Sequence, residues 1–191
     1  MINTYVTRLW ALAASTGGPE ALDRIFRALP ADIPPVLVVQ HMPPGFTKLF
    51  ADRLDSLCPM EIREAEDGDV PRRGLVLVAP AERHMKLSAA GGKLRVSCFA
   101  GQRMHGVMPA ADVLFESVAE IMGERGVGAV LTGMGRDGAQ GLLAMRRRGA
   151  RTICQDEESS VVYGMPKAAF ELGAAEFVLP LEKIAEKLME L

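Results

Sequence analysis

The sequence predicts an α/β fold: a single domain with a doubly wound, mostly parallel sheet, helices on both faces and a small antiparallel hairpin. Short, continuous apolar runs alternate with amphipathic helical patterns, which is typical of βαβ units around a buried parallel sheet. Of the 191 residues, 49% are hydrophobic and 24% charged, close to the globular average, so disordered and fibrous classes are excluded. Neither a repeat nor a linker interrupts the chain, and we therefore expect one domain over residues 1–191.

The first half of the chain alternates strands and helices and then adds a hairpin. Each expected strand is a short apolar run, and each expected helix carries apolar side chains at helical spacing. The turn Gly91-Gly92 separates two short runs and predicts the hairpin. In order, we expect strand 6–13, a helix including 21–29, strand 36–39, helix 46–57, strand 75–78, and a hairpin of 85–87 with 94–96.

The second half repeats the alternation. Pro109 begins a helix that runs through Ile121, and glycines end it before the next apolar run. The following elements, in order, are strand 127–132, helix 139–148, strand 151–155, a short helix 166–172, strand 177–179 and a terminal helix 181–191. Arg146-Arg147-Arg148 falls at a helix end, where cations complement the macrodipole.

Charge and cysteine usage exclude several classes of function. The 22 Lys and Arg nearly balance the 24 Asp and Glu, whereas a nucleic-acid surface carries a basic excess. The three cysteines have no CxxC spacing, which predicts free thiols rather than disulfides or a zinc site. No apolar stretch reaches membrane-spanning length, and Arg8 interrupts the only apolar stretch near the N-terminus, so we expect neither membrane insertion nor a signal peptide. We predict a soluble cytoplasmic protein; no pattern selects an oligomeric state.

Three polar groups follow three of the expected strands. Ser15 and Thr16 come after the first strand, His41 after the second, and Asp137 lies in the glycine-rich segment 133–138 after strand 127–132. Ligands of open parallel sheets bind outside the carboxyl ends of the strands, so these groups should meet at one edge. A hydroxyl, an imidazole and a carboxylate are the groups of a serine-hydrolase triad.

The chemistry of acyl transfer uses one group of each type. A serine hydroxyl becomes a good nucleophile when a neutral imidazole accepts its proton. A carboxylate on the other ring nitrogen fixes the tautomer and stabilises the imidazolium. In this interpretation Ser15 is the nucleophile, His41 the base and Asp137 the orienting carboxylate, while backbone N–H groups of 133–138 bind the oxyanion.

Each of these residues also has a structural interpretation, which the sequence alone leaves open. Ser15 or Thr16 can cap the following helix, and 15–18 can be a phosphate-binding turn at a helix N-terminus. His41 can serve as a structural hydrogen-bonding group, and Asp137 before a glycine is also an ordinary turn signature. A non-catalytic α/β module that binds a phosphorylated ligand at 15–18 is therefore the alternative to an enzyme.

Three segments contain the candidate residues: AASTGGPEA at 13–21, QHMPPGFT at 40–47 and LTGMGRDG at 131–138. In this order they resemble the nucleophile, histidine and aspartate segments of the CheB family of chemotaxis protein-glutamate methylesterases, and together they are highly specific. The resemblance runs in family order from about Leu12 to the C-terminus. Shorter matches lie at 64–68, 79–80, 84–85, 112–115 and 164–166.

This resemblance implies hydrolysis of γ-glutamyl methyl esters on cytoplasmic helices of methyl-accepting chemoreceptors, releasing methanol, without metal or cofactor. By matching position it assigns Ser15 as nucleophile, His41 as general base and Asp137 as its orienting carboxylate. It gives the Met134 backbone N–H to the oxyanion and Thr16 to support of the histidine. Deamidation of receptor glutamines is also implied, because an amide passes through the same tetrahedral intermediate.

The sequence departs from the family in two places. Many members carry an N-terminal receiver domain that blocks the active site until it is phosphorylated, and we expect only the catalytic domain here. At 107–110 the chain has Val-Met-Pro-Ala where many relatives have His-Arg-Pro-Ser. We interpret the acidic cluster around Gly68 as a solvated loop, and we assign neither His84 nor His105 to catalysis. The acidic residues of that cluster are Glu61, Glu64, Glu66, Asp67 and Asp69.

Overall fold

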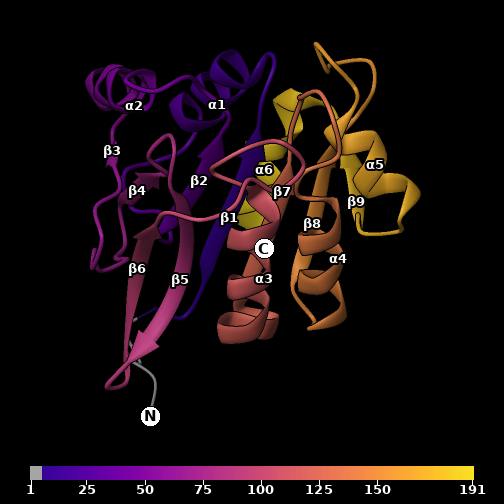
Figure 1. The fold of residues 1–191 in the computed structure, drawn as a ribbon. Helices are drawn as coiled ribbons and strands as arrows, with labels where there is room; N and C mark the ends of the chain where they lie inside the picture. The colour runs from indigo at the N-terminus through magenta and orange to yellow at the C-terminus, as the bar shows by residue number, and fades with distance from the viewer. Residues whose placement is uncertain (1–5) are drawn as a thin grey trace.

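The computed structural model describes residues 6–191, so residues 1–5 of the expected domain lie outside the described residues. Strands and helices alternate as the apolar runs indicate (Figure 1). In chain order they are β1 (Leu9–Ala14), α1 (Gly18–Arg27), β2 (Val36–Gln40), α2 (Phe46–Leu57), β3 (Glu61–Glu64), β4 (Leu75–Val78), β5 (His84–Ala90), β6 (Lys93–Phe99), α3 (Ala111–Met122), a 3-10 turn η1 (Gly123–Arg125), β7 (Gly126–Val130), α4 (Ala139–Arg147), β8 (Arg151–Gln155), α5 (Met165–Glu171), β9 (Phe177–Leu179) and α6 (Leu181–Glu190).

Seven strands form one sheet in the order β3-β4-β2-β1-β7-β8-β9. Every neighbouring pair in it is parallel. The remaining two strands, β5 and β6, pair with each other as an antiparallel hairpin. The predicted doubly wound parallel sheet with a small hairpin is therefore confirmed.

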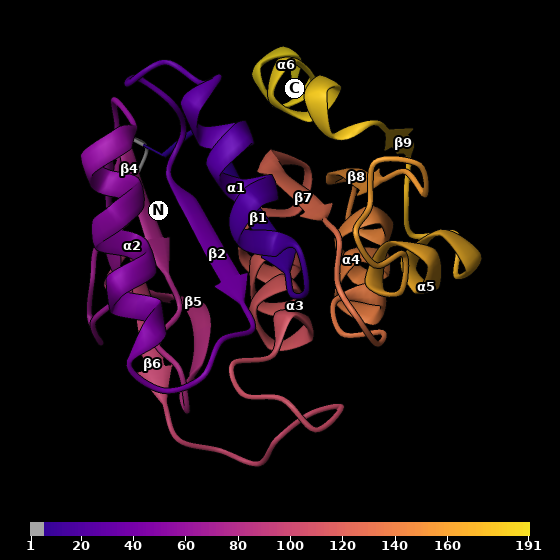
Figure 2. The same cartoon turned by 90° about the horizontal axis from the view of Figure 1, so that it is seen from above.

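The sheet is buried on both faces because its strands are apolar on both sides. In β1, Leu9, Ala11 and Ala13 pack into one core, and the alternating side chains of the same strand pack into the other. The first core is covered by α3, α4, α5 and the β5–β6 hairpin, and the second by α1, α2 and α6. Figure 2 shows α1 and α6 on the opposite side of the sheet from α3 and α4.

The order of the strands reverses beside β1. The chain moves from β1 to β2 on one side, and later places β7 on the other side. Such a reversal opens a crevice at the carboxyl ends of the two flanking strands. The segments that follow β1, β2 and β7 consequently share one edge of the sheet, and these are the segments that hold Ser15, His41 and Asp137.

Two predictions about local structure are wrong. The acidic segment is not a solvated loop throughout, because Glu61–Glu64 forms the edge strand β3 beside β4. Only Ile62 of this strand is buried, and a single apolar residue gives no run to recognise. The charges are instead neutralised in pairs: Arg72 donates to Glu61, and Arg63 to Asp69. The first strand begins at Leu9 rather than at residue 6.

Some smaller boundaries also differ from the expected ones. The hairpin strands extend beyond their apolar centres, because backbone pairing continues to the Gly91-Gly92 turn. Helix α3 begins at Ala111, two residues after Pro109. Among residues 6–191, no helix is long and apolar enough to cross a membrane.

Candidate active site

The turn after β1 holds Ser15 at the sheet edge by backbone hydrogen bonds. Ser15 N donates to the carbonyl of Thr132 at 3.0 Å, and Gly18 N donates to the carbonyl of Ser15 at 2.8 Å. Gly17, with φ of +80°, occupies the N-cap position of α1, which has no side-chain cap. Neither Ser15 nor Thr16 therefore caps the helix, and the structural interpretation of these residues as caps is wrong.

The loop after β7 passes close to Ser15. A methyl group at Gly133 would lie 2.8 Å from Ser15 Cβ and 2.4 Å from Met165 Sδ, so this close approach requires glycine. The Ser15 hydroxyl makes no hydrogen bond to any residue in the described part of the chain. It is consequently unpaired at the sheet edge where β2 and β7 end.

His41 lies next to the Ser15 turn because β1 and β2 are neighbours. Its backbone N–H donates to the carbonyl of Ala14 at 3.1 Å. Its Nε2 is 2.8 Å from Oδ2 of Asp137, and the two side chains are 12% and 3% exposed. Since Asp137 occupies Nε2, Nδ1 is the ring nitrogen left to accept a proton. Hydrogen bonds between nucleophile and base are often formed only when substrate is bound, so the unpaired Ser15 hydroxyl is compatible with a triad.

Asp137 is fixed by the N-terminus of α3. The backbone N–H groups of Ala111 and Asp112 donate to its Oδ2 and Oδ1 at 2.6 and 3.1 Å. Burial alone raises the pKa of this carboxyl, but the hydrogen bonds from His41 and from these two N–H groups outweigh burial and hold the pKa below its ordinary value. The positive end of the α3 dipole acts in the same direction. Asp137 is therefore ionised and oriented toward the imidazole.

A strand-terminal glutamine that the sequence analysis did not assign connects the two segments. The Gln40 Nε2 donates to the backbone carbonyls of Ser15 and His41, both at 3.0 Å, and the residue is 1% exposed. Gln155 has a parallel position at the end of β8, where its Oε1 accepts the Thr132 N–H at 2.8 Å. The sequence contains a signal for both glutamines, because each is the polar last residue of a buried strand.

The two supporting residues predicted from the resemblance lie at the same edge. Met134 is 70% exposed, and its backbone N–H has no acceptor within residues 6–191. An unpaired backbone N–H beside a nucleophile can stabilise an oxyanion. Thr16 is also exposed, and its carbonyl accepts the Thr132 hydroxyl at 2.9 Å. No hydrogen bond joins the Thr16 side chain to His41 among the described residues, so its supporting role stays a prediction.

A cavity of about 280 Å³ opens against His41. Val107 and Met108, which depart from the family's His-Arg, line it and make this wall apolar. An arginine is nevertheless present, because Arg103 lines the same cavity and donates to both oxygens of Glu82 at 2.7 Å. This cavity is large enough for a short side chain and ends at the proposed base.

A second histidine–aspartate pair lies behind the first. His105 Nε2 is 2.8 Å from Oδ2 of the buried Asp112, and ligand atoms of His105, Asp112 and Asp137 lie within 4.8 Å of one another. A metal ion can bridge such a spacing, but each of the four carboxylate oxygens already has a hydrogen-bond donor. Gly141 N donates to the remaining oxygen, Oδ1 of Asp112, at 2.7 Å. The cluster therefore fits a hydrogen-bonded network better than a metal site.

The remaining histidine is structural. The His84 Nε2 is 2.8 Å from the carbonyl of Gln102, and Nδ1 accepts the Ala110 N–H at 3.2 Å. It thus joins the β5 strand to the segment that precedes α3. Neither of these two bonds joins His84 to a member of the proposed triad.

Comparison with known proteins identifies the family. The sequence profile described as CheB methylesterase matches residues 10–188. A protein of Bdellovibrio bacteriovorus named protein-glutamate methylesterase/protein-glutamine glutaminase is 53% identical over 96% of this chain and 52% of its own length. A protein of the same name from Pyrococcus abyssi is 51% identical over 92% of this chain and 48% of its own. The chain thus spans about half the length of the curated relatives it matches.

A solved structure gives the same result over a matching length. The crystal structure of the Thermotoga maritima CheB methylesterase catalytic domain superposes with a TM-score of 0.94 at 42% identity, covering 96% of this chain and 97% of that one. Membership of one family therefore explains the sheet order, the glycine-rich loop at Ser15 and the three sequence segments. The chain belongs to the CheB methylesterase family.

Proposed function

We propose that this chain is a serine esterase that removes methyl groups from glutamate γ-methyl esters on chemoreceptor helices and releases methanol. The observation that carries the proposal is the 2.8 Å hydrogen bond from His41 Nε2 to the buried Asp137, at the sheet edge where Ser15 is unpaired. The names of the relatives, which pair methylesterase with glutaminase, support the same substrate class.

The reaction proceeds in two acyl-transfer steps. The Ser15 Oγ attacks the ester carbonyl carbon while His41 Nδ1 takes the hydroxyl proton, and Asp137 stabilises the imidazolium. The Met134 N–H donates to the oxygen that becomes negative. The intermediate then expels the methoxy group, which takes the proton from His41 and leaves as methanol. Water, deprotonated by His41, cleaves the resulting ester of Ser15, which frees the glutamate and regenerates the hydroxyl.

The same residues support deamidation of receptor glutamines. The tetrahedral intermediate of an amide needs the same nucleophile and oxyanion donor, and the imidazolium then protonates the leaving ammonia. Amides are poorer acyl donors than esters, so we expect the esterase reaction to be faster. No step of either reaction calls for a metal ion or an organic cofactor.

The rival interpretation, a non-catalytic module that binds a phosphorylated ligand at 15–18, is not favoured. It explains neither the buried carboxylate on His41 nor the agreement with relatives whose names describe an enzyme. Since the receptor segments that carry the esters are cytoplasmic, we place the activity in the cytoplasm. The proposed partners are the receptor helices alone, with neither nucleic acid nor membrane insertion.

The decisive experiment is methanol release from methylated chemoreceptor by wild type, Ser15→Ala, His41→Ala and the double variant. Because the residues act as a unit, each variant should lose on the order of 10⁶-fold in kcat, and the double variant no more than either single one. Ser88→Ala, on the β5–β6 hairpin, is the matched control and should keep full activity. Methanol release that survives Ser15→Ala, or no release by folded wild type, contradicts the proposal. Ammonia release from glutamine-bearing receptor measures the second activity.

A further inference from the structure

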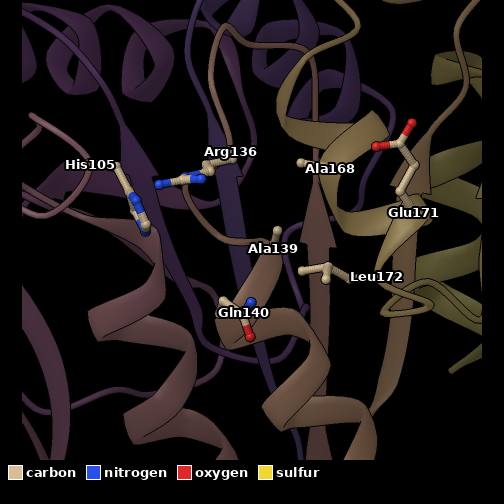
Figure 3. A pocket seen from close by; sticks show the side chains of 7 residues that line it. All are labelled: His105, Arg136, Ala139, Gln140, Ala168, Glu171 and Leu172. Carbon is tan, nitrogen blue, oxygen red and sulfur yellow. The ribbon is translucent and has the colours of Figure 1, made fainter.

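A second cavity, of about 460 Å³, has Arg136, the residue before Asp137, in its lining (Figure 3). It is bounded by the turn that holds His105, by the loop and first turn of α4, and by the end of α5. The loop is the one that carries Met134 and Asp137, and α5 is attached to it because Met165 N donates to the Gly133 carbonyl at 2.8 Å. The cavity is thus built onto the same loop that approaches Ser15.

One wall of this cavity is apolar and the other presents hydrogen-bond donors. Ala139, Ala168 and Leu172 form the apolar part, and Leu172 projects into the cavity in Figure 3. Arg136 and Gln140 supply the donors, and the Arg136 guanidinium is directed toward His105. A wall of this kind accommodates a short methylene chain that ends in a hydrogen-bond acceptor.

The charge in the cavity comes from Arg136. Within residues 6–191, no carboxylate lies within ion-pair distance of its guanidinium. His105 Nε2 is hydrogen-bonded to the Asp112 carboxylate at 2.8 Å, so this nitrogen is not free to bind a second carboxylate. Glu171 also lines the cavity, but its carboxylate lies on the far side from Arg136 in Figure 3 and is 3.9 Å from Lys167 Nζ. Among the described residues, Arg136 therefore presents a guanidinium that no carboxylate pairs, and this group is suited to bidentate binding of a carboxylate.

We propose that this cavity binds an unmodified glutamate side chain of the substrate helix, next to the methylated glutamate that reacts with Ser15. The inference rests on the proposed function. The methylenes of the bound glutamate pack on Ala168 and Leu172, and its carboxylate accepts hydrogen bonds from Arg136 and Gln140. On a helix, residues three, four or seven apart lie on one face, so both side chains can enter the protein together.

Binding of a glutamate in this cavity affects the order in which neighbouring positions react. The esterase and glutaminase reactions both produce a glutamate, and Arg136 binds a carboxylate better than it binds a neutral ester or amide. A helix from which one methyl group has been removed is therefore a better substrate at a neighbouring position than a fully methylated helix. The product of one turnover favours the next on the same helix.

The test uses helical peptides with a single glutamyl methyl ester and a second position three, four or seven residues away on either side. That second position is Glu or Met, since Met is an unbranched residue of similar length without charge or a reactive amide. Methanol release gives kcat/KM for wild type, Arg136→Gln and Arg147→Gln, the last an exposed arginine near the end of α4. At one spacing, wild type should prefer the Glu peptide by about tenfold, the size expected of a hydrogen-bonded charge.

The ratio of kcat/KM for the Glu peptide to that for the Met peptide should fall to near one in Arg136→Gln, mostly because KM for the Glu peptide rises. In Arg147→Gln the ratio should stay at the wild-type value. A second variant, Leu172→Glu, adds a carboxylate to the cavity and should also abolish the preference. Wild type that hydrolyses Glu and Met peptides equally at every spacing overturns the subsite but leaves the esterase assignment intact. A preference that persists in Arg136→Gln also overturns the subsite. No methanol from any peptide, by folded wild type, overturns both proposals.

Discussion

Replacing Asp137 with asparagine tests the carboxylate on which the proposed mechanism depends. The imidazolium that forms on His41 during acyl transfer lies 2.8 Å from Asp137 Oδ2. At an effective dielectric constant of about 20, the lost attraction is about 6 kcal/mol. That energy acts only when the imidazole is charged, so it appears in the barrier and predicts a loss of about 10⁴-fold in kcat. Removing the orienting aspartate from a serine triad has a cost of about the same size.

The variant should fold, because asparagine keeps the shape of the buried side chain. Oδ2 has two donors, from Ala111 and His41, whereas Oδ1 has only the Asp112 N–H. The amide NH₂ will therefore take the Oδ1 position, where it leaves one backbone N–H without an acceptor. An unsatisfied buried donor costs about 1–3 kcal/mol of unfolding free energy, which urea denaturation can measure.

The assay is kcat for methanol release by wild type and Asp137→Asn, at a temperature where both are folded by circular dichroism. Asp69→Asn is a suitable control, because it breaks a 2.7 Å ion pair to Arg63 in β3, and β4 and β2 separate β3 from β1, which precedes Ser15. It should lower stability without lowering kcat. If Asp137→Asn retains kcat within about tenfold of wild type, the imidazolium is not stabilised by this carboxylate, and the triad as described is wrong.

Three further outcomes follow from single contacts. Gly133→Ala places a methyl group 2.8 Å from Ser15 Cβ, so it should lower both kcat and the thermal midpoint, and unchanged values would contradict this close approach. Burial raises the pKa of the Cys154 thiol to about 12, so at pH 8 a thiol reagent should label Cys58, which is only half-buried, and reach Cys154 only on unfolding. The lowered pKa of Asp137 stabilises the fold above about pH 4, and this contribution is lost as pH falls through the folded-state pKa. Lowering the pH from about 5 to about 2 should therefore reduce the free energy of unfolding, measured with urea, more for wild type than for Asp137→Asn.

The buried strands of the fold follow directly from sequence, whereas the edge strand β3 does not. Strands that are covered on both faces are continuous apolar runs, as in Val36–Gln40 and Leu75–Val78, and such runs are visible in one sequence. The edge strand β3 has one buried side chain, Ile62, and its pairing with β4 depends on a partner fourteen residues away. Tertiary pairing and ion pairs, rather than local pattern, make that segment extended.

Some features of the site also follow from local sequence pattern, and others depend on tertiary packing. Ser15, His41 and Asp137 follow strands, so the strand-end argument places them at one edge. The donors to Asp137 come from the N-terminus of α3, and their position depends on how α3 packs against α4. No pattern in the sequence indicates this packing. The sequence shows that a polar residue, Gln40, ends a buried strand, but it does not show which groups Gln40 binds. Its two acceptors, the carbonyls of Ser15 and His41, lie in turns that the pairing of β1 with β2 brings together.

The position of the three residues depends on strand order and not on chain order. β1 lies between β2 and β7 at the point where the order of the parallel strands reverses. The residues after β1, β2 and β7 therefore meet whatever sequence distance separates them, with Ser15 in the centre and the other two approaching from either side. His41 and Asp137 are 96 positions apart, yet each needs only to follow a neighbour of β1. The order Ser, His, Asp is thus a direct consequence of the winding of this sheet. Arg136 directly precedes Asp137 in the chain, so the loop that brings Asp137 to this edge also carries the arginine of the cavity proposed to bind the neighbouring glutamate.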